Sequence, residues 1–272
     1  MGYGDFRYRL RMAARREPAL WCIIRINVGV ALLCWLTSII ASAQDSGFSF
    51  AAWLSVPASL SALASLAWTP LTYMFTQTQP LHLLFNMLWL FWFGQVLSDA
   101  TDQKHIWRGY IIGGLSGALF FIVSKTLIPS LGGASLSGAS GAVVAIMVEA
   151  AFRQPDREFR LFLIGNVKLK WLAVISLGLL LLGLGGGNAG GQAAHIGGAL
   201  AGCILFLFDR RKRVRRNAVR TSPRQAAKVV NAMAAYRTDM ERLDELLDKI
   251  KLSGYESLTR SEKKELQKLS DR

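Results

Sequence analysis

Long apolar stretches separated by short polar connections make up the first three quarters of the chain. Six of them suit membrane helices, at about 21–42, 81–98, 109–128, 140–153, 170–185 and 193–208. A helix of about 20 apolar residues crosses a hydrocarbon core about 30 Å thick. The pattern therefore predicts an all-α polytopic membrane protein, with a six-helix transmembrane bundle within residues 21–208.

The segment 43–80 is apolar enough to suggest a seventh span. It contains Pro57, Pro70 and many serines, however, and an odd number of spans would put the two basic termini on opposite sides of the membrane. We predict that 43–80 is a long exported loop, helical in part. Aromatic side chains such as Trp53 and Trp68 suit a position in the membrane interface.

Basic residues gather near the ends of the predicted spans. The net charge is +14, and arginines cluster within residues 1–20 and again after Phe208, whereas 43–80 contains no Lys or Arg. Such an excess is typical of cytoplasmic segments. We therefore predict a cytoplasmic N-terminus at 1–20 and a cytoplasmic tail at 209–272. The basic tail is expected to contact anionic lipid headgroups rather than nucleic acid.

Four polar side chains inside the spans need an explanation: His82, Asn86, Ser140 and His195. Ser140 and Asn86 each lie 13 residues before a charged residue at the end of their span, and His195 lies 14 before Asp209. At a rise of about 1.5 Å per residue, these three lie roughly 20 Å from the cytoplasmic edge. His82 is one turn from Asn86 on the same helical face. A single polar residue commonly has only a structural role, but a shared depth indicates a common site.

The span at 140–153 is too short to cross a bilayer, and glycines at positions 138 and 141 surround its first serine. Irregular backbone at membrane depth occurs only where protein or water satisfies it. The helix is therefore expected to begin in a buried cavity that water can reach. Gly138 would allow a sharp turn there. Free N–H groups at a helix N-terminus suit a developing oxyanion.

Small residues follow both Ser140 and His195. Gly141 and Ala145 form one small-residue face, and Gly198 and Gly202 form another. Such faces let two helices approach closely in lipid. The approach would bring the imidazole of His195 to the hydroxyl of Ser140, a pairing of general base and nucleophile.

No acidic residue is expected at the depth of this pair, so the predicted catalytic group is a dyad. Glu149 lies near the cytoplasmic end of its span, four residues from Arg153, with which it can pair. No metal or cofactor is predicted. The three cysteines lack zinc or disulfide spacing, and His105, expected in the cytoplasmic loop after the second span, is too far from the other histidines for a zinc site.

Three motifs occur in order along the chain: HLLFN at 82–86, GASG at 138–141 and AHIGGALAG at 194–202. With them, the sequence resembles the rhomboid intramembrane serine proteases over about 68–208. The resemblance implies Ser140 as nucleophile, His195 as general base and acid, and an oxyanion hole of His82, Asn86 and the Ser140 backbone N–H. It implies hydrolysis of peptide bonds in or near the membrane segments of single-pass proteins, through an acyl-enzyme and without a cofactor.

The sequence departs from the family pattern at three positions. Many members have arginine where Thr69 stands, a further histidine where Gln77 stands, and an aromatic residue where Val144 stands. The departures concern the anchoring of the first loop and the orientation of the catalytic histidine. Two alternatives therefore stay open: a rhomboid-like pseudoprotease that binds transmembrane helices without cleaving them, and a membrane scaffold or small-solute carrier.

The tail has the composition of a soluble segment. Its predicted helices lie at about 224–252 and 260–270, and the second opens with a capping box of Thr259 and Glu262. A heptad seam within 229–250 consists of Val229, Met233, Tyr236, Met240, Leu243, Leu247 and Ile250. The helices are expected to fold on each other or on the membrane domain; self-association or partner docking through the seam is the alternative. The tail resembles an extension of Bacteroidota rhomboid proteins, which implies a bacterial inner membrane.

Overall fold

The computed structural model describes residues 17–130, 133–161, 165–182, 189–220 and 223–270. The chain separates into two compact units, Met1–Asp209 and Arg210–Arg272, and each is described by itself. The first unit contains the long apolar helices, together with two small sheets that the sequence did not predict.

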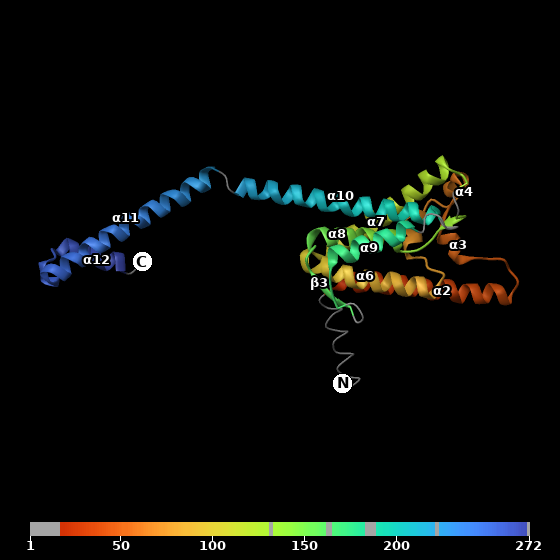
Figure 1. Ribbon diagram of the computed structural model, residues 1–272, viewed down its shortest axis with the longest axis horizontal. Coiled ribbons are helices and arrows are strands. Elements are labelled where there is room, and N and C mark those ends of the chain that lie inside the picture. The colour runs from red at the N-terminus through yellow and green to blue at the C-terminus, as the bar shows by residue number, and fades with distance from the viewer. Residues whose placement is uncertain (1–16, 131–132, 162–164, 183–188, 221–222, 271–272) are drawn as a thin grey trace, which may run out of the picture. The chain divides into compact units, whose positions relative to one another are not determined.

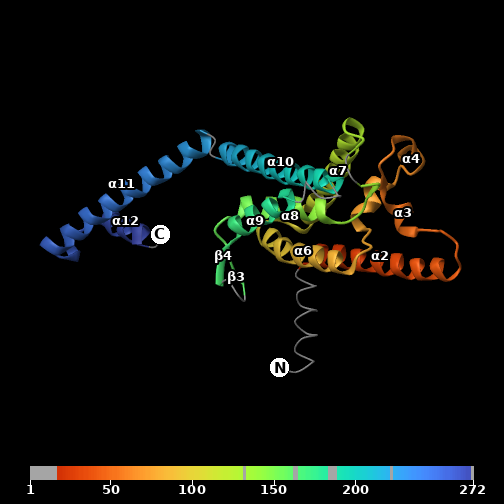
Figure 2. The same cartoon turned by 45° about the vertical axis from the view of Figure 1, so that its right-hand side comes forward.

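In the described part of the first unit, six helices of 14 residues or more form the bundle, and the last of them continues into the second unit (Figure 1, Figure 2). They are α2 (Pro18–Ala43), α6 (Pro80–Ala100), α7 (Gln103–Leu127), α8 (Ser140–Arg153), α9 (Leu169–Leu182) and α10 (Ala189–Arg220). By length and composition, four helices of the described part can cross a membrane: α2, α6, α7 and the segment Gly190–Lys212 of α10. The protein is thus a multi-pass membrane protein, and the count of six spans stays a prediction.

Helix α8 lies among α6, α7, α9 and α10 and has the bounds expected from the sequence (Figure 2). Every residue from Gly141 to Ala150 is buried. A helix that is buried on all sides is a core helix, which needs apolar or small residues around its whole circumference. Its short length therefore fits a position inside the bundle, with Ser140 at one end and Arg153 at the other.

Two helix boundaries differ from the predictions. Helix α7 begins at Gln103 rather than at about residue 109, because the Asp102 side chain caps it by accepting a 2.8 Å hydrogen bond from the backbone N–H of His105. The last helix continues beyond residue 208 to Arg220. The end of the predicted span 170–185 lies outside the described residues.

His105 accordingly lies in the first turn of α7 and not in a loop as predicted. It is buried, and its Nε2 lies 2.5 Å from Oε1 of Glu149, which also accepts a 2.7 Å bond from Arg153. Arg108 and Arg153 in turn bind Asp209. This cluster joins α7, α8 and α10 at the end of α8 opposite Ser140. The carboxylates of Glu149 and Asp209 are thus paired with arginine guanidinium groups, which compete with any metal ion for the same oxygens.

The loop between α2 and α6 contains only short elements. They are α3 (Phe50–Leu54), β1 (Val56–Pro57), α4 (Leu60–Ser65), α5 (Thr69–Thr72) and the 3-10 turn η1 (Tyr73–Phe75). The longest has six residues, which is too short for a seventh span. Trp68 donates a 3.0 Å hydrogen bond from Nε1 to the carbonyl of Trp53, and the two indoles are in contact.

Two short antiparallel pairings fix the connections on either side of α8. Strand β1 pairs with β2 (Ser135–Leu136), so the long loop is hydrogen-bonded to the segment that leads into Ser140. Between α8 and α9, β3 (Glu158–Leu161) pairs with β4 (Gly165–Lys168). In sequence this second region reads only as a charged connection, because four residues are too few to establish an alternating pattern.

The tail unit contains α11 (Pro223–Ser253), a 3-10 turn η3 (Tyr255–Ser257) and α12 (Arg260–Ser270). The capping box is formed: Thr259 N–H donates to Glu262, and Glu262 N–H donates to the hydroxyl of Thr259. Hydrogen bonds from Lys249 and Thr259 lower the pKa of Glu262 to about 2. The two helices thus fold on each other.

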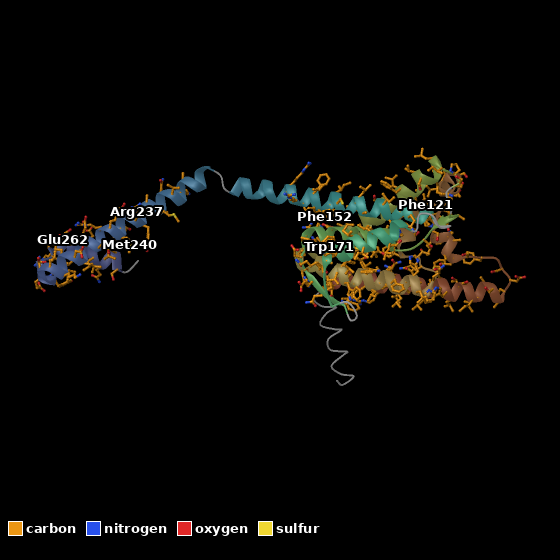
Figure 3. All side chains as sticks on the ribbon, viewed as in Figure 1. Phe121, Phe152, Trp171, Arg237, Met240 and Glu262 are labelled. Carbon is orange, nitrogen blue, oxygen red and sulfur yellow. The ribbon has the colours of Figure 1, made fainter. Side chains whose placement is uncertain are left out.

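The heptad seam of α11 is only partly covered by α12. Leu246, which is not a seam residue, is 1% exposed, whereas Met233 is 70% exposed. Met240, labelled in Figure 3, is exposed as well. The side chain of Val229 lies outside the described residues. The pairing of the two helices therefore uses the C-terminal half of α11, and self-association through the remaining seam stays a prediction.

Candidate active site

Ser140 is the first residue of α8 and follows a sharp turn. Gly138 has φ +120°, a conformation that a residue with a side chain rarely adopts, and its N–H donates a 3.0 Å hydrogen bond to the carbonyl of Tyr73. The first intrahelical bond runs from Val143 N–H to the carbonyl of Ala139. The N–H groups of Ser140 and the two residues after it have no acceptor within the helix.

His195, on α10, reaches Ser140 directly. Its Nε2 lies 2.8 Å from Oγ of Ser140, and the histidine is 9% exposed. The sequence placed both residues at the same depth on separate helices, and the structure brings them into hydrogen-bonding contact. Such a contact is the geometry that a base needs to take a proton from a nucleophile.

Backbone contact between α8 and α10 makes this short distance feasible. A Cβ added to Gly198 would overlap the carbonyl oxygen of Gly141, and one added to Gly202 would lie 2.5 Å from the carbonyl oxygen of Ala145. The two small-residue faces therefore meet each other. Only glycine at these two positions of α10 allows the helices to approach so closely.

The second ring nitrogen of His195 has a partner that the sequence analysis missed. Nδ1 lies 2.9 Å from Oε1 of Gln192, one turn earlier on α10. The i−3 spacing on a helix was a signal that could have revealed this contact. The search for a third group considered acidic residues alone and therefore overlooked a neutral amide.

His82 and Asn86 lie on α6 beside the start of α8. A Cβ added to Gly138 would lie 3.0 Å from Cε1 of His82, so the imidazole is against the turn that precedes Ser140. Asn86 is buried and lines the same cavity as Ser140. All four residues predicted from their depth are thus in one region of the bundle.

Asn86 belongs to a buried chain of amides. Its Nδ2 donates a 2.9 Å hydrogen bond to Oε1 of Gln77, whose Nε2 donates a 3.1 Å bond to Oδ1 of Asn27 on α2. Nδ2 of Asn27 donates to the carbonyl of Ile23 and to the hydroxyl of Tyr110. We call Asn27, Gln77 and Asn86 the amide chain.

The amide chain has a fixed direction. A backbone carbonyl can only accept, so the carbonyl of Ile23 requires the amino group of Asn27 to face it. The oxygen of Asn27 must then face the amino group of Gln77, and the oxygen of Gln77 must face the amino group of Asn86. One N–H of Asn86 is therefore held by Gln77, and its second N–H is not used in any bond among the described residues.

Replacing Gln77 by leucine is expected to destabilise the protein by about 1–3 kcal/mol for each buried group that loses its partner. The groups are the amino group of Asn86 and the oxygen of Asn27. Denaturant unfolding in detergent measures the effect. The same change at Gln44, which is exposed, is the control and should leave the unfolding midpoint unchanged. Equal midpoints for both variants would contradict the assigned bonds.

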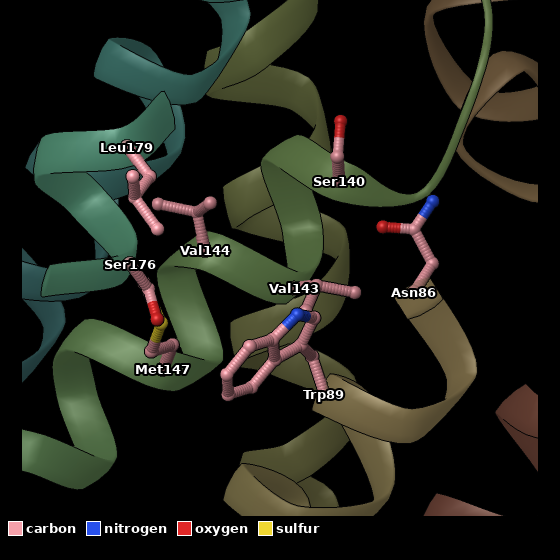
Figure 4. A pocket seen from close by; sticks show the side chains of 8 residues that line it. All are labelled: Asn86, Trp89, Ser140, Val143, Val144, Met147, Ser176 and Leu179. Atoms are coloured by element: carbon pink, nitrogen blue, oxygen red, sulfur yellow. The ribbon is translucent and has the colours of Figure 1, made fainter. Parts of the chain in front are cut away.

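A cavity of about 240 Å³ opens beside Ser140, between α6, α8 and α9. It is lined by Asn86, Trp89, Ser140, Val143, Val144, Met147, Ser176 and Leu179. Figure 4 shows Ser140 and Asn86 at one end of the lining and Met147, Ser176 and Leu179 toward the other. The lining is mostly apolar and contains no carboxylate.

Residues 64–212, which include every helix that lines this cavity, match the family model of the rhomboid domain. The match covers more than half of the chain. The chain belongs to the rhomboid family. Residues 236–272 of this rhomboid protein match a second model, a family of unknown function (DUF6576), which lies within the tail unit.

The chain is similar to a protein named RHOMBOID-like protein 12, mitochondrial, of Arabidopsis thaliana. The two are 28% identical over 160 residues, which are 54% of this chain and 48% of the relative. The chain thus spans about half the length of this relative. Membership of the rhomboid family and a multi-pass membrane fold follow from these matches. A bacterial origin stays a prediction.

Proposed function

We propose that this rhomboid protein is an intramembrane serine endopeptidase that hydrolyses peptide bonds in or near the transmembrane segments of single-pass proteins. The observation that carries the proposal is the 2.8 Å contact between Oγ of Ser140 and Nε2 of His195, beside a mostly apolar cavity that Ser140 lines. A pseudoprotease needs no such contact between a nucleophile and a base.

In the first step, His195 Nε2 takes the proton of Ser140 as Oγ attacks the substrate carbonyl carbon. The negative charge that develops on the carbonyl oxygen needs hydrogen-bond donors already in place. The Ser140 backbone N–H, the second N–H of Asn86 and the ring of His82 are the proposed donors. His195 then gives its proton to the leaving amine, and an acyl-enzyme remains.

Water completes the reaction. It loses a proton to His195 as its oxygen attacks the ester carbonyl, and the proton returns to Oγ of Ser140 when the ester breaks. Every proton transfer thus uses the same nitrogen, so no metal or cofactor is required. The loop between α2 and α6, paired through β1 with the segment before Ser140, is proposed to shape the access of substrates.

The cavity indicates the class of substrate. Its walls are apolar side chains of α6, α8 and α9, which suit apolar residues of a membrane segment and not a charged peptide. We place the enzyme in a cell's inner (plasma) membrane, with both termini cytoplasmic, on the basis of the arginines near both ends of the membrane domain. The proposed partners are lipid and single-pass membrane proteins; nucleic acid is not proposed as a partner.

Labelling with a fluorophosphonate tests the proposed chemistry in detergent or proteoliposomes. The reagent should modify Ser140. The His195→Ala variant should be labelled at least about 10²-fold more slowly, since it lacks the base. Ser176→Ala is the matched control, because its hydroxyl lies on the same cavity but donates to the carbonyl of Leu172. If the wild-type protein is not labelled but still binds the transmembrane helices of single-pass proteins, it is a pseudoprotease instead.

A further inference from the structure

We propose that Gln192 is a positioning residue, which holds His195 in the tautomer and orientation that the reaction needs. The inference rests on the proposed function. It assigns to a neutral amide the place that a carboxylate has in a Ser-His-Asp triad. The observation is the 2.9 Å contact between Oε1 of Gln192 and Nδ1 of His195, on the side of the ring opposite Ser140.

The argument begins with the protons of the imidazole. A neutral imidazole carries one ring proton, and Nε2 accepts the proton of Ser140 only if that ring proton is on Nδ1. A proton on Nδ1 needs an acceptor, and the oxygen of Gln192 is within hydrogen-bonding distance. With the amide reversed, its amino group would donate to Nδ1, the proton would be on Nε2, and no base would face Ser140.

The contact also limits the rotation of the ring. Gln192 and His195 are three residues apart on α10 and therefore lie on one face of the helix. The imidazole is bonded at both nitrogens, to Gln192 and to Ser140, so its plane is defined by two contacts.

A neutral amide suits this location. Gln192 is partly buried within the segment Gly190–Lys212, which can cross a membrane. A carboxylate at membrane depth is costly to bury. The amide keeps the hydrogen bond to Nδ1 without adding a charge. It stabilises the imidazolium less than a carboxylate would.

Two variants of the whole chain in proteoliposomes test the inference through the kinetics of reporter cleavage between about pH 5 and pH 9. Gln192→Met keeps the approximate size of the side chain but replaces the amide oxygen by a thioether, which is only a weak hydrogen-bond acceptor. With this variant kcat should fall about tenfold or more with KM unchanged. Gln192→Glu should retain activity. Its carboxylate would stabilise the imidazolium, so the acidic limb of the pH profile should move to higher pH by about one unit.

The control is Gln154→Met at the far end of α8, which should leave kcat and the pH profile unchanged. A merely structural role would lower stability in both Gln192 variants without moving the pH profile. The inference is overturned if kcat of Gln192→Met is within twofold of wild type, or if the profile of Gln192→Glu superimposes on that of wild type. Should the methionine variant not fold, the profile of the glutamate variant decides. Absence of cleavage by the wild type would instead refute the proposed function.

Discussion

Replacing Ser140 by alanine is expected to lower cleavage of a single-pass reporter by about 10⁴-fold or more. The change removes the only hydroxyl within hydrogen-bonding distance of Nε2 of His195 in the described part of the chain. Replacing His195 by alanine should have a similarly large effect, and the double variant should be little worse than either single one. Residues that act as one unit are strongly non-additive.

The assay uses the purified protein in proteoliposomes, with mass spectrometry of the fragments made by the wild type. Ser176→Ala is again the control, since it removes a hydroxyl from the same cavity. Denaturant unfolding of Ser140→Ala checks that the variant folds: the loss of the hydrogen-bond partner of His195 should cost no more than about 1–3 kcal/mol. Cleavage by Ser140→Ala at the wild-type rate would show that the nucleophile is assigned wrongly.

The parts of the site that the sequence could predict are those fixed by helical geometry. The rise per residue gave Ser140, Asn86 and His195 a common depth, and the structure places them together. The small-residue spacing at Gly198 and Gly202 indicated a close helix contact, and these glycines lie against α8. Such regularities need only spacing along one chain segment, so they are readable without coordinates.

Contacts between distant segments could not be predicted in this way. Gln77 bonds to Asn27 across 50 positions of sequence, and Asn86 depends on both through the amide chain. No periodic pattern connects a residue of the loop to one of α2, because the loop's path is set by short turns and by the β1–β2 pairing. The start of α7 was misplaced for a local reason: the Asp102 cap lies before the apolar run that marked the span.

The amide chain and Gln192 share a physical feature. Each position uses a neutral amide where a charged group would have to be desolvated, and the direction of the amide chain is fixed by the carbonyl of Ile23. The oxygen of Gln77 orients the amide of Asn86, whereas Gln192 is proposed to orient the ring of His195. The two halves of the proposed machinery, the oxyanion donors and the base, are thereby oriented from separate elements, so a change in one should leave the geometry of the other intact.

Replacing Gly198 by alanine is expected to separate the two helices that carry the dyad. The added methyl group would occupy the space of the Gly141 carbonyl oxygen, which is backbone of α8 and cannot rotate away. Overpacking of this kind costs about 1–3 kcal/mol. A displacement of about 1 Å between reacting groups can lower the rate by about 10²-fold. We therefore expect kcat of reporter cleavage to fall by about two orders of magnitude, with a lower unfolding midpoint.

The matched control for this prediction is Gly29→Ala, because a Cβ added at Gly29 of α2 would meet nothing within 4 Å. Alanine also favours a helix more than glycine does, by about 1 kcal/mol, so this variant should be as stable as wild type or more so, with unchanged cleavage. Fluorophosphonate labelling separates the causes in Gly198→Ala: slow labelling of a folded variant indicates a displaced His195. Wild-type labelling and cleavage by Gly198→Ala would mean that the contact between Ser140 and His195 does not depend on the close approach of α8 and α10.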